Sequence, residues 1–463
     1  MVRRVLIETF GCQMNVADSE LIQGILQDSG YQAAASLEDA DVVLLNTCAV
    51  RERAEERIFG RLSNLVSWKR QRPGAQLGVA GCMAERMRHS VMERAPYVDF
   101  VIGPDSYRRL AEVLERSQTR PVTDVQLDRH EMYEGLTPVQ TQNVCGWVTI
   151  QRGCDKFCTF CVVPFVRGRE RAVGPAEVLR HVERLVARGV TTVTLLGQTV
   201  NSYLHEGVDF AELLKRVAAV EGIQRIRFTS PYPRDFTEEL IDVIAAEEKV
   251  SKALHLPLQS GSDRVLGLMR RQHTVQEYRE LVSKIRCRVE GCALSTDIIV
   301  GFPGETEEDY RATVGCIQEF RFDAAFLFNY SEREGTYAAR KLVDDVSPQE
   351  KGRRLTELIA IQEEISRLAY EARIGTTQAV IVEGSTRRDE TRMMGNTDDF
   401  KTTMFPGQGY RVGDLIEVKI VGATSHTLLG EPIRVLVPSA VPITLVDSLT
   451  EGISLGASAP AHG

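Results

Sequence analysis

Three cysteines crowded into one short loop are the residues of this sequence with the clearest chemical meaning. Cys154, Cys158 and Cys161 have the spacing Cys-x₃-Cys-x₂-Cys in the stretch VTIQRGCDKFCTFCVVPFVRGR. They are too crowded for a disulfide framework and one ligand short of a closed zinc site. Three thiolates from one loop instead suit a cubane four-iron four-sulfur cluster that leaves one iron open. The alternatives are a structural zinc ion or three buried thiols without a metal, because free cysteines often act as small core residues.

The same loop resembles the signature of the radical S-adenosylmethionine enzymes. The spacing is alike, Phe160 stands directly before the last cysteine, and a strand-like run at residues 147–150 precedes the loop. The resemblance implies that the methionine moiety of S-adenosylmethionine chelates the open iron. One electron from the cluster then cleaves the sulfonium to a 5′-deoxyadenosyl radical.

The length and composition are those of a multidomain globular protein. The chain has 463 residues, 43% of them apolar and 26% charged, which predicts roughly two to four domains. No run approaches the roughly 18 apolar residues of a membrane helix, and the N-terminal stretch MVRRVLIETFGC has no signal-peptide core. We therefore expect a cytoplasmic protein that makes no membrane contact, in which the ten cysteines are metal ligands or core residues.

The formal charge of −8 limits how this protein could bind a polyanion. Binding of nucleic acid must come from local basic patches and not from the average field. Such patches include Arg167, Arg169 and Arg171 beside the cysteine loop, and Arg387 and Arg388 nearer the C-terminus. Because acidic residues interleave in several patches, the simpler interpretation of each is a solvated helix face or loop.

Residues 1–138 have the pattern of a doubly wound α/β domain, in which short apolar runs alternate with helical periodicity. The expected strands lie at residues 5–7, 42–45 and 77–80, and the expected helices at residues 19–29, 50–68 and 106–116. We expect Asp18 or Ser19 to cap the first helix.

A second set of cysteines follows the three strands of this domain. Cys12 comes after the first strand, Cys48 after the second and Cys82 after the third. Functional groups gather at the carboxyl ends of parallel strands, so these thiols can converge and hold a second cluster. Gly11 and Gly81, each directly before a cysteine, would let the backbone approach a metal closely. The alternative is three unrelated buried thiols at strand ends.

Residues 144–372 repeat a strand and a helix about six times, which predicts an incomplete (β/α)₆ barrel with its chemistry at the strand carboxyl ends. The expected strands lie at residues 147–151, 192–196, 225–228, 253–256, 294–300 and 324–330, and the last helix spans residues 347–372. Polar side chains near these strand ends predict a binding rim. They are Gln198, Asn201, Gln259, Ser260 and Asp297. We expect His255 and His273 to be structural.

Residues 373–437 alternate short strands with turns, which predicts a five-stranded barrel of a type that commonly binds RNA. The tail at residues 438–463 is rich in Ala, Ser, Gly and Pro, and we expect it to be disordered. The overall fold class is therefore α/β, with a small C-terminal β-barrel.

The order of these parts resembles the methylthiotransferase family of radical enzymes over residues 8–431. In that family an N-terminal domain holds an auxiliary cluster, a radical barrel follows, and a C-terminal TRAM domain docks the substrate. The strings TFGCQMNVADSE, NTCAVRERAEERIFGRL, CDKFCTFCVVPFVRGRE, HLPLQSGSD and ATSHTLLGE are similar to its tRNA-modifying branch.

The resemblance implies two 4Fe-4S clusters. On this resemblance, the ligands of the auxiliary cluster would be Cys12, Cys48 and Cys82, and those of the radical cluster would be Cys154, Cys158 and Cys161. The backbone of Phe160 would lie against the adenine of S-adenosylmethionine. The rest of that pocket would come from Gln198, Asn201, Gln259, Ser260 and Asp297. The other four cysteines match no ligand position.

The implied reaction uses S-adenosylmethionine twice. One molecule methylates a sulfur held at the auxiliary cluster, and a second gives the radical that removes the hydrogen from carbon 2 of an adenosine. That adenosine lies at position 37 of tRNA and already carries an isopentenyl group. An electron donor and a supplier of sulfur or clusters are implied partners.

Two related substrates are alternatives: threonylcarbamoyl-adenosine in tRNA and an aspartate of a ribosomal protein. An RNA-binding iron–sulfur scaffold without catalysis is an alternative of another class, against which the two intact cysteine triads argue. Thr199, Tyr232 and the pair Ala172-Val173 depart from the branch's usual residues, which concerns the fine substrate contacts and not the chemistry.

Overall fold

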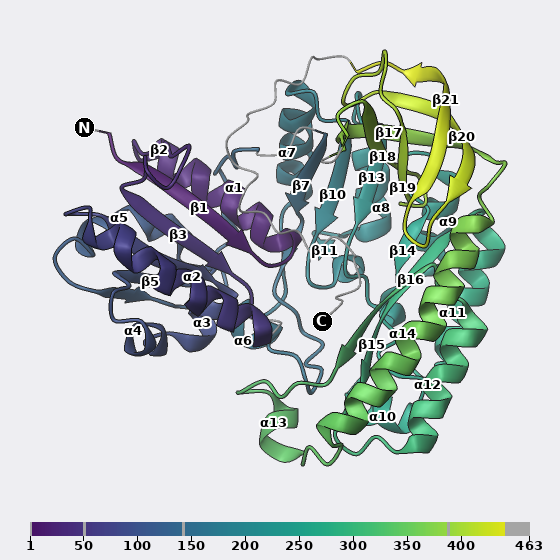
Figure 1. Ribbon diagram of the computed structural model, residues 1–463, viewed down its shortest axis with the longest axis horizontal. Helices are drawn as coiled ribbons and strands as arrows, with labels where there is room; N and C mark the ends of the chain where they lie inside the picture. The colour runs from purple at the N-terminus through teal and green to yellow at the C-terminus, as the bar shows by residue number, and fades with distance from the viewer. Residues whose placement is uncertain (1, 50–51, 141–143, 387–388, 440–463) are drawn as a thin grey trace.

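The computed structural model describes residues 2–49, 52–140, 144–386 and 389–439. Figure 1 shows an N-terminal α/β layer structure beside a curved central sheet, with a small β-barrel packed on the far end of that sheet. In the described residues no helix combines the length and the apolarity needed to cross a bilayer.

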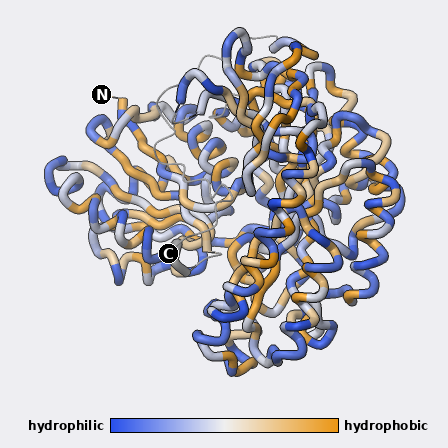
Figure 2. Tube along the Cα trace, turned by 45° about the vertical axis from the view of Figure 1, so that its right-hand side comes forward, coloured by the Kyte–Doolittle hydropathy of each residue, from blue (hydrophilic) through white to orange (hydrophobic). Residues whose placement is uncertain are grey.

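The N-terminal part is a six-stranded parallel sheet in the order β2-β1-β3-β4-β5-β6. Its strands are β1 (Arg4–Phe10), β2 (Gln32–Ala33), β3 (Val42–Thr47), β4 (Gln76–Gly81), β5 (Phe100–Ile102) and β6 (Val122–Asp124). Every residue of β3 and β4 is buried, as expected of parallel strands covered on both faces. Figure 2 shows these strands as mostly hydrophobic runs.

Helices cover both faces of this sheet, which confirms the predicted doubly wound arrangement. Residues of α1 (Gln13–Asp28) and α5 (Leu110–Arg116) pack together on one face. Residues of α2 (Glu52–Arg70), α3 (Cys82–Met87) and α4 (Ser90–Arg94) pack on the other. The carboxyl ends of β1, β3 and β4 therefore lie side by side, with a helix beginning near each.

The predicted start of the first helix is wrong. Helix α1 begins at Gln13 with Cys12 as its N-cap, so Asp18 and Ser19 lie inside the helix and not at its end. The side chain of Asn15 closes the cap by accepting from the backbone N–H of Cys12 at 3.3 Å. The first turns are buried, and residues distant in sequence bind their polar groups: Asn46 of β3 binds Asn15, and Arg152 of the central domain binds Asp18.

The central part contains the six predicted strands as two parallel three-stranded sheets, β7-β10-β13 and β14-β15-β16. The strands are β7 (Cys145–Thr149), β10 (Thr192–Leu196), β13 (Arg225–Phe228), β14 (Ala253–His255), β15 (Ala293–Val300) and β16 (Ala324–Asn329). A parallel bridge between Ile226 and Val250 joins the two sheets. The result is an open, incomplete barrel.

Helices cover the convex side of this barrel (Figure 1). They are α7 (Pro175–Ala187), α8 (Phe210–Ala218), α9 (Glu238–Ala246), α10 (Asp263–Leu268), α11 (Val275–Arg288), α12 (Glu307–Phe320) and α14 (Pro348–Glu371). Hydrophobic residues of these helices and of the strands form one continuous core, among them Val182, Leu214, Ile285 and Ile317.

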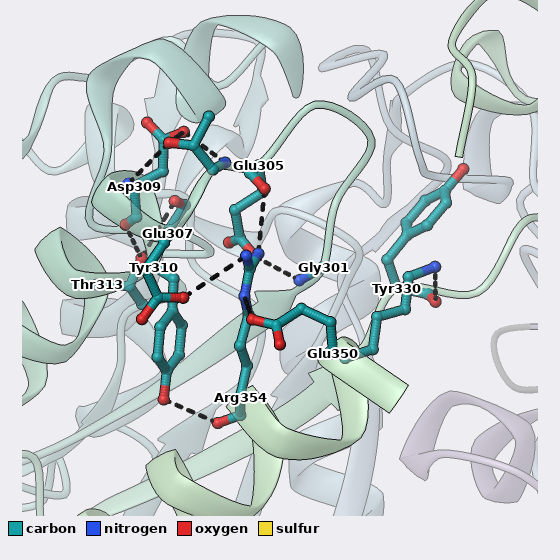
Figure 3. Close-up of polar contacts among 12 residues, drawn as sticks. Gly301, Glu305, Glu307, Asp309, Tyr310, Thr313, Tyr330, Glu350 and Arg354 are labelled. Carbon is teal, nitrogen blue, oxygen red and sulfur yellow. Dashed lines mark hydrogen bonds and ion pairs between the residues drawn. The ribbon is translucent and has the colours of Figure 1, made fainter. Parts of the chain in front are cut away.

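A buried ion pair fixes the loop after β15 against α14 (Figure 3). The guanidinium of Arg354 lies 2.7 Å from the carboxylate of Glu305, and neither side chain is more than 6% exposed. Glu305 also accepts from the backbone N–H of Gly301 at 2.6 Å, and the hydroxyl of Tyr310 donates to the carbonyl of Arg354 at 3.0 Å. These bonds satisfy charged groups that burial alone would penalise.

The C-terminal part is a closed five-stranded barrel in the order β17-β18-β19-β21-β20. Its strands are β17 (Thr377–Ser385), β18 (Arg392–Thr397), β19 (Thr402–Pro406), β20 (Leu415–Ala423) and β21 (Leu428–Val437). The barrel docks on the central domain through Arg225, which donates to the carbonyl of Asn396 at 2.7 Å, and through an ion pair of Lys401 and Asp323 at 2.6 Å. The predicted disordered tail lies outside the described residues from residue 440 onward.

Candidate metal and cofactor site

The first cysteine triad lies at three neighbouring strand ends. Phe10 of β1 pairs with Thr47 of β3, and Thr47 pairs with Gly81 of β4. Cys48 and Cys82 therefore follow directly from paired residues, and Cys12 comes two residues after Phe10. A hydrogen bond with the Cys48 thiol lowers the pKa of Cys12 to about 6, and the nearby Arg167 guanidinium acts in the same direction. The sheet register thus gathers these three side chains.

The glycines before these cysteines allow close approach of the backbone. A Cβ on Gly81 would lie 2.4 Å from the carbonyl oxygen of Thr47, and its φ of 93° favours glycine. A Cβ on Gly11 would lie 2.8 Å from the Cβ of Cys48. Each glycine is therefore required by the packing around the triad.

A buried arginine from the central domain reaches this triad. Arg167 is 3% exposed, and its Nε donates to the sulfur of Cys82 at 3.0 Å. Its Nη2 lies 2.6 Å from Asp18 on α1, whose carboxylate also pairs with Arg152 at 3.2 Å. Nη1 of Arg167 is buried and has no hydrogen-bond partner in the described part of the chain. A buried cation with a free donor beside three thiols suits an anionic group such as an iron–sulfur cluster with thiolate ligands.

The second triad lies in the loop between β8 (Gln151–Arg152) and α6 (Val163–Val166). The N–H of Cys161 donates to the carbonyl of Cys158 at 3.1 Å, and the N–H of Lys156 lies 3.5 Å from the sulfur of Cys154. Burial raises the pKa of Cys154 to about 11 and that of Cys161 to about 12, with the neighbouring Cys158 thiol adding to both shifts. A bound metal would favour the thiolates that burial disfavours.

Contacts with α10 hold this loop in place. The N–H of Thr159 donates to the carbonyl of Met269 at 3.0 Å, and its hydroxyl donates to the carbonyl of Leu268 at 2.9 Å. Arg271, which follows α10, places Nη1 3.5 Å from the sulfur of Cys158. Each triad therefore has an arginine against one of its thiols. Across the described residues, no three His, Cys, Asp or Glu side chains form a ready-made site for a single metal ion.

The predicted cofactor-pocket residues divide into two groups. Gln198 and Gln259 each have a buried side-chain oxygen without a partner among the described residues, so both amides are free to accept from a ligand. Gln259 has a φ of 74°, held by backbone bonds to Asp297 and Ile299. Phe160 is half-buried and packs edge-to-face on Phe302, with ring centroids 6.4 Å apart.

Asn201 and Ser260 are engaged in internal contacts instead. The amide of Asn201 donates to the carbonyl of Tyr232 at 2.8 Å and accepts from its N–H at 2.7 Å. Ser260 is fully buried and lies 3.4 Å from the hydroxyl of Thr313. The structure thus places these two residues behind the rim, where they support it.

Three features of the site escaped the sequence reasoning. His255 lies 3.3 Å from Asp297, and both side chains are about a quarter exposed, so this histidine adjoins a predicted rim residue. Tyr232 lies between two cations, Lys156 at 4.8 Å and Arg271 at 4.5 Å from its ring. The third feature is the pair of arginines, Arg152 and Arg167, that bind Asp18. Their positions on either side of the cysteine loop are the only sign of this contact that the sequence offered.

Comparisons with known proteins agree for the N-terminal, central and C-terminal parts of the chain. Residues 4–103 match the Uncharacterized protein family UPF0004, residues 148–317 the Radical SAM superfamily and residues 371–433 the TRAM domain. The tRNA-2-methylthio-N(6)-dimethylallyladenosine synthase of Chloroherpeton thalassium is 45% identical over 430 residues, covering 92% of this chain and 95% of that protein. The protein of the same name in Prosthecochloris aestuarii is 44% identical over 433 residues, covering 93% and 98%.

Among solved structures, the radical S-adenosylmethionine methyltransferase TsrM of Kitasatospora setae, with cobalamin and a [4Fe-4S] cluster bound, has a TM-score of 0.56. It is 16% identical and covers 73% of this chain and 74% of its own. This likeness bears on the fold alone.

Proposed function

This chain belongs to the tRNA-2-methylthio-N(6)-dimethylallyladenosine synthases, and from that premise we propose how its residues divide the work of the reaction. The protein is a radical S-adenosylmethionine enzyme that adds a methylthio group to carbon 2 of isopentenyl-adenosine at position 37 of tRNA. Neither threonylcarbamoyl-adenosine nor a ribosomal-protein aspartate is favoured as substrate, and a non-catalytic scaffold is not favoured either.

The cofactors of this family are an iron–sulfur cluster and S-adenosylmethionine. We propose two 4Fe-4S clusters in this chain. Cys154, Cys158 and Cys161 would hold the radical cluster, and Cys12, Cys48 and Cys82 the auxiliary cluster. When bound, these groups supply the one-electron chemistry and the transferred sulfur, which no side chain can provide.

The observation that carries this proposal is a pair of arginines that join the segment after the radical loop to the N-terminal domain. Arg167 comes six residues after Cys161 in the radical loop, yet it donates to Cys82 in the N-terminal domain. Arg171, from the same segment, pairs with Asp105 of the N-terminal domain at 3.0 Å, and the two side chains are 8% and 1% exposed. Both proposed clusters therefore border one interface, as a reaction that needs both requires.

The other site residues have roles that follow from their contacts. The free amide oxygens of Gln198 and Gln259 would accept from N–H or O–H groups of bound S-adenosylmethionine, and the backbone at Phe160 would help to hold it. Asp297 faces the same rim with His255. Asn201 fixes the backbone at Tyr232 and Ser260 supports the turn before α10, so both are positioning residues.

The tRNA contacts and the remaining partners belong to the same proposal. We divide the chain into an N-terminal domain at residues 1–138, a radical domain at 144–372 and a TRAM domain at 373–437. The TRAM domain binds the tRNA, which fits a closed barrel fixed on the central domain by Arg225 and Lys401. An external electron donor and a supplier of sulfur or of clusters complete the cycle.

Nucleoside mass spectrometry tests this function. Reconstituted protein is incubated anaerobically with isopentenylated tRNA, S-adenosylmethionine and a reductant, and we expect a 2-methylthio-isopentenyladenosine peak. The Cys12→Ala variant should still form 5′-deoxyadenosine but give no methylthio product. Its matched control is Cys287→Ala, which alters an exposed thiol outside both triads. A methylthio product from Cys12→Ala would remove the first triad from the mechanism.

A further inference from the structure

Arg167 makes one contact more than it would need only to hold the two domains together. Its guanidinium is almost completely buried, it pairs with Asp18, and it also donates from Nε to the sulfur of Cys82 at 3.0 Å. Arg171, on the same segment, pairs with Asp105 of the N-terminal domain and forms no hydrogen bond to a cysteine in the described part of the chain. One arginine therefore fastens the domains and touches a proposed cluster ligand, whereas the other only fastens them.

The geometry allows Arg167 to act on the cluster and to stay in place. Its backbone N–H donates to the carbonyl of Val163 at 2.8 Å, and its own carbonyl accepts from Arg171 at 2.9 Å. Cys82 packs with Val162 and Val166 of the same segment in one small apolar cluster. Low exposure keeps water from competing for the Nε–H donor, which strengthens its bond to sulfur.

A hydrogen bond to a ligand sulfur has a known effect on an iron–sulfur centre. It withdraws electron density from the thiolate and stabilises the reduced cluster, so the reduction potential rises. The new carbon–sulfur bond holds two electrons, whereas the carbon radical brings one and the methylthiolate brings two. One electron is therefore left over; the auxiliary iron–sulfur centre would accept it, and a higher potential there would favour this transfer.

We propose that Arg167 is a positioning residue of the auxiliary site, which raises the reduction potential of the centre held by Cys82 while it fastens the radical loop to the N-terminal domain. The inference rests on the cluster assignment proposed above. Asp18 sets the strength of the effect, because its carboxylate offsets part of the positive charge of the guanidinium.

The test is a redox titration of the auxiliary centre in the full-length chain. The parent protein carries Cys154→Ala, Cys158→Ala and Cys161→Ala, so that only the auxiliary signal remains, and its midpoint potential is followed by electron paramagnetic resonance. We expect Arg167→Gln to shift the midpoint to a more negative potential. Arg171→Gln is the matched control, since it breaks an interdomain ion pair without touching Cys82, and it should leave the midpoint unchanged.

Asp18→Asn gives an independent check with the opposite sign. While the domains stay docked, it leaves Arg167 beside Cys82 without its counter-charge, so the midpoint should shift to a more positive potential. Hydrogen exchange in α1 and α6 at the parent's level identifies the docked state. An unchanged midpoint in both Arg167→Gln and Asp18→Asn, each at the parent's iron content, would overturn the proposal. Absence of iron from the parent itself would instead overturn the cluster assignment. Equal shifts in Arg167→Gln and Arg171→Gln would show a role in domain closure only.

Discussion

Neutralising Asp18 tests whether the two domains are joined through a buried charge. This carboxylate is fully buried and pairs with Arg167 at 2.6 Å and with Arg152 at 3.2 Å. The change Asp18→Asn keeps the shape of the side chain but leaves two buried guanidinium groups without their counter-charge. Removing one partner of a buried ion pair typically costs about 3–5 kcal/mol.

Separation of the two domains limits the loss of stability that this change can cause. Both arginines belong to the central domain, so separation of the two domains would return them to water. We therefore expect Asp18→Asn to reduce the free energy of unfolding by no more than the free energy of domain docking. Once the domains separate, hydrogen exchange should rise selectively in α1, which carries Asp18, and in α6, which directly precedes Arg167.

The assay compares Asp18→Asn with Asp39→Asn in full-length protein, by calorimetry and by hydrogen exchange. Asp39 pairs with Arg4 at 3.3 Å, but the two side chains are 45% and 50% exposed, so the loss of that pair should cost about 0–1 kcal/mol. The double variant Asp18→Asn with Arg167→Gln should recover part of the loss, since it removes one unpaired charge. Equal effects of Asp18→Asn and Asp39→Asn would refute the buried-charge argument.

Three further predictions concern pH, iron content and tRNA binding. Burial raises the pKa of Glu85 from 4.5 to about 7, so the folded state holds an extra proton and its stability falls as pH rises from about 4.5 through 7. Glu85→Gln should therefore raise the free energy of unfolding at pH 8 more than at pH 5, by at most about 3 kcal/mol, whereas the change Glu115→Gln at an exposed site should not; thermal unfolding at the two pH values measures the difference. Replacing Cys154, Cys158 and Cys161 together by Ala should remove 5′-deoxyadenosine formation and about half the iron, if the two clusters are of equal size; unchanged iron in elemental analysis would contradict this. Deleting residues 373–463 should weaken tRNA binding and its dependence on salt, measured by fluorescence anisotropy at two salt concentrations; equal affinity with and without the deletion at both would exclude a docking role.

The sequence predicted the strands better than the polar helix ends. Strands β10 (TVTLL) and β13 (RIRF) begin and end at the predicted residues, because a local pattern identifies each: a largely apolar run in β10 and strict alternation of charged and apolar residues in β13. The first turns of α1, with the sequence QMNVAD, lack such a pattern, and the sequence reasoning left them out of the helix. Asn15 accepts from the nearby N–H of Cys12 at 3.3 Å, but its amide nitrogen donates to Asn46, a residue distant in sequence, at 3.2 Å. Local reasoning has no access to such partners.

The same limit applied to the candidate site. Strand order alone indicated that Cys12, Cys48 and Cys82 would be neighbours, and the sheet register places them so. The sequence could not show that Gln198 and Asn201 differ in their hydrogen bonding. The amide oxygen of Gln198 is free, whereas the amide of Asn201 is bound to the backbone of Tyr232. Both are polar residues after one strand, and only the fold decides which side chain faces a ligand.

The arginines beside the radical loop show why charge patterns need the structure for their interpretation. The sequence allowed Arg167, Arg169 and Arg171 to be a basic patch for nucleic acid or a solvated face. Instead, Arg167 pairs with Asp18 and Arg171 with Asp105, each with its side chain no more than 8% exposed, and Arg169 pairs with Asp155 at 2.6 Å. Their charge is compensated by acidic residues within the protein, so this patch contributes little attraction for a polyanion. With a formal charge of −8 over the whole chain, attraction for tRNA must come from basic residues elsewhere, such as the exposed Arg392 on β18. The loss of salt dependence on deletion of residues 373–463 follows from that reasoning.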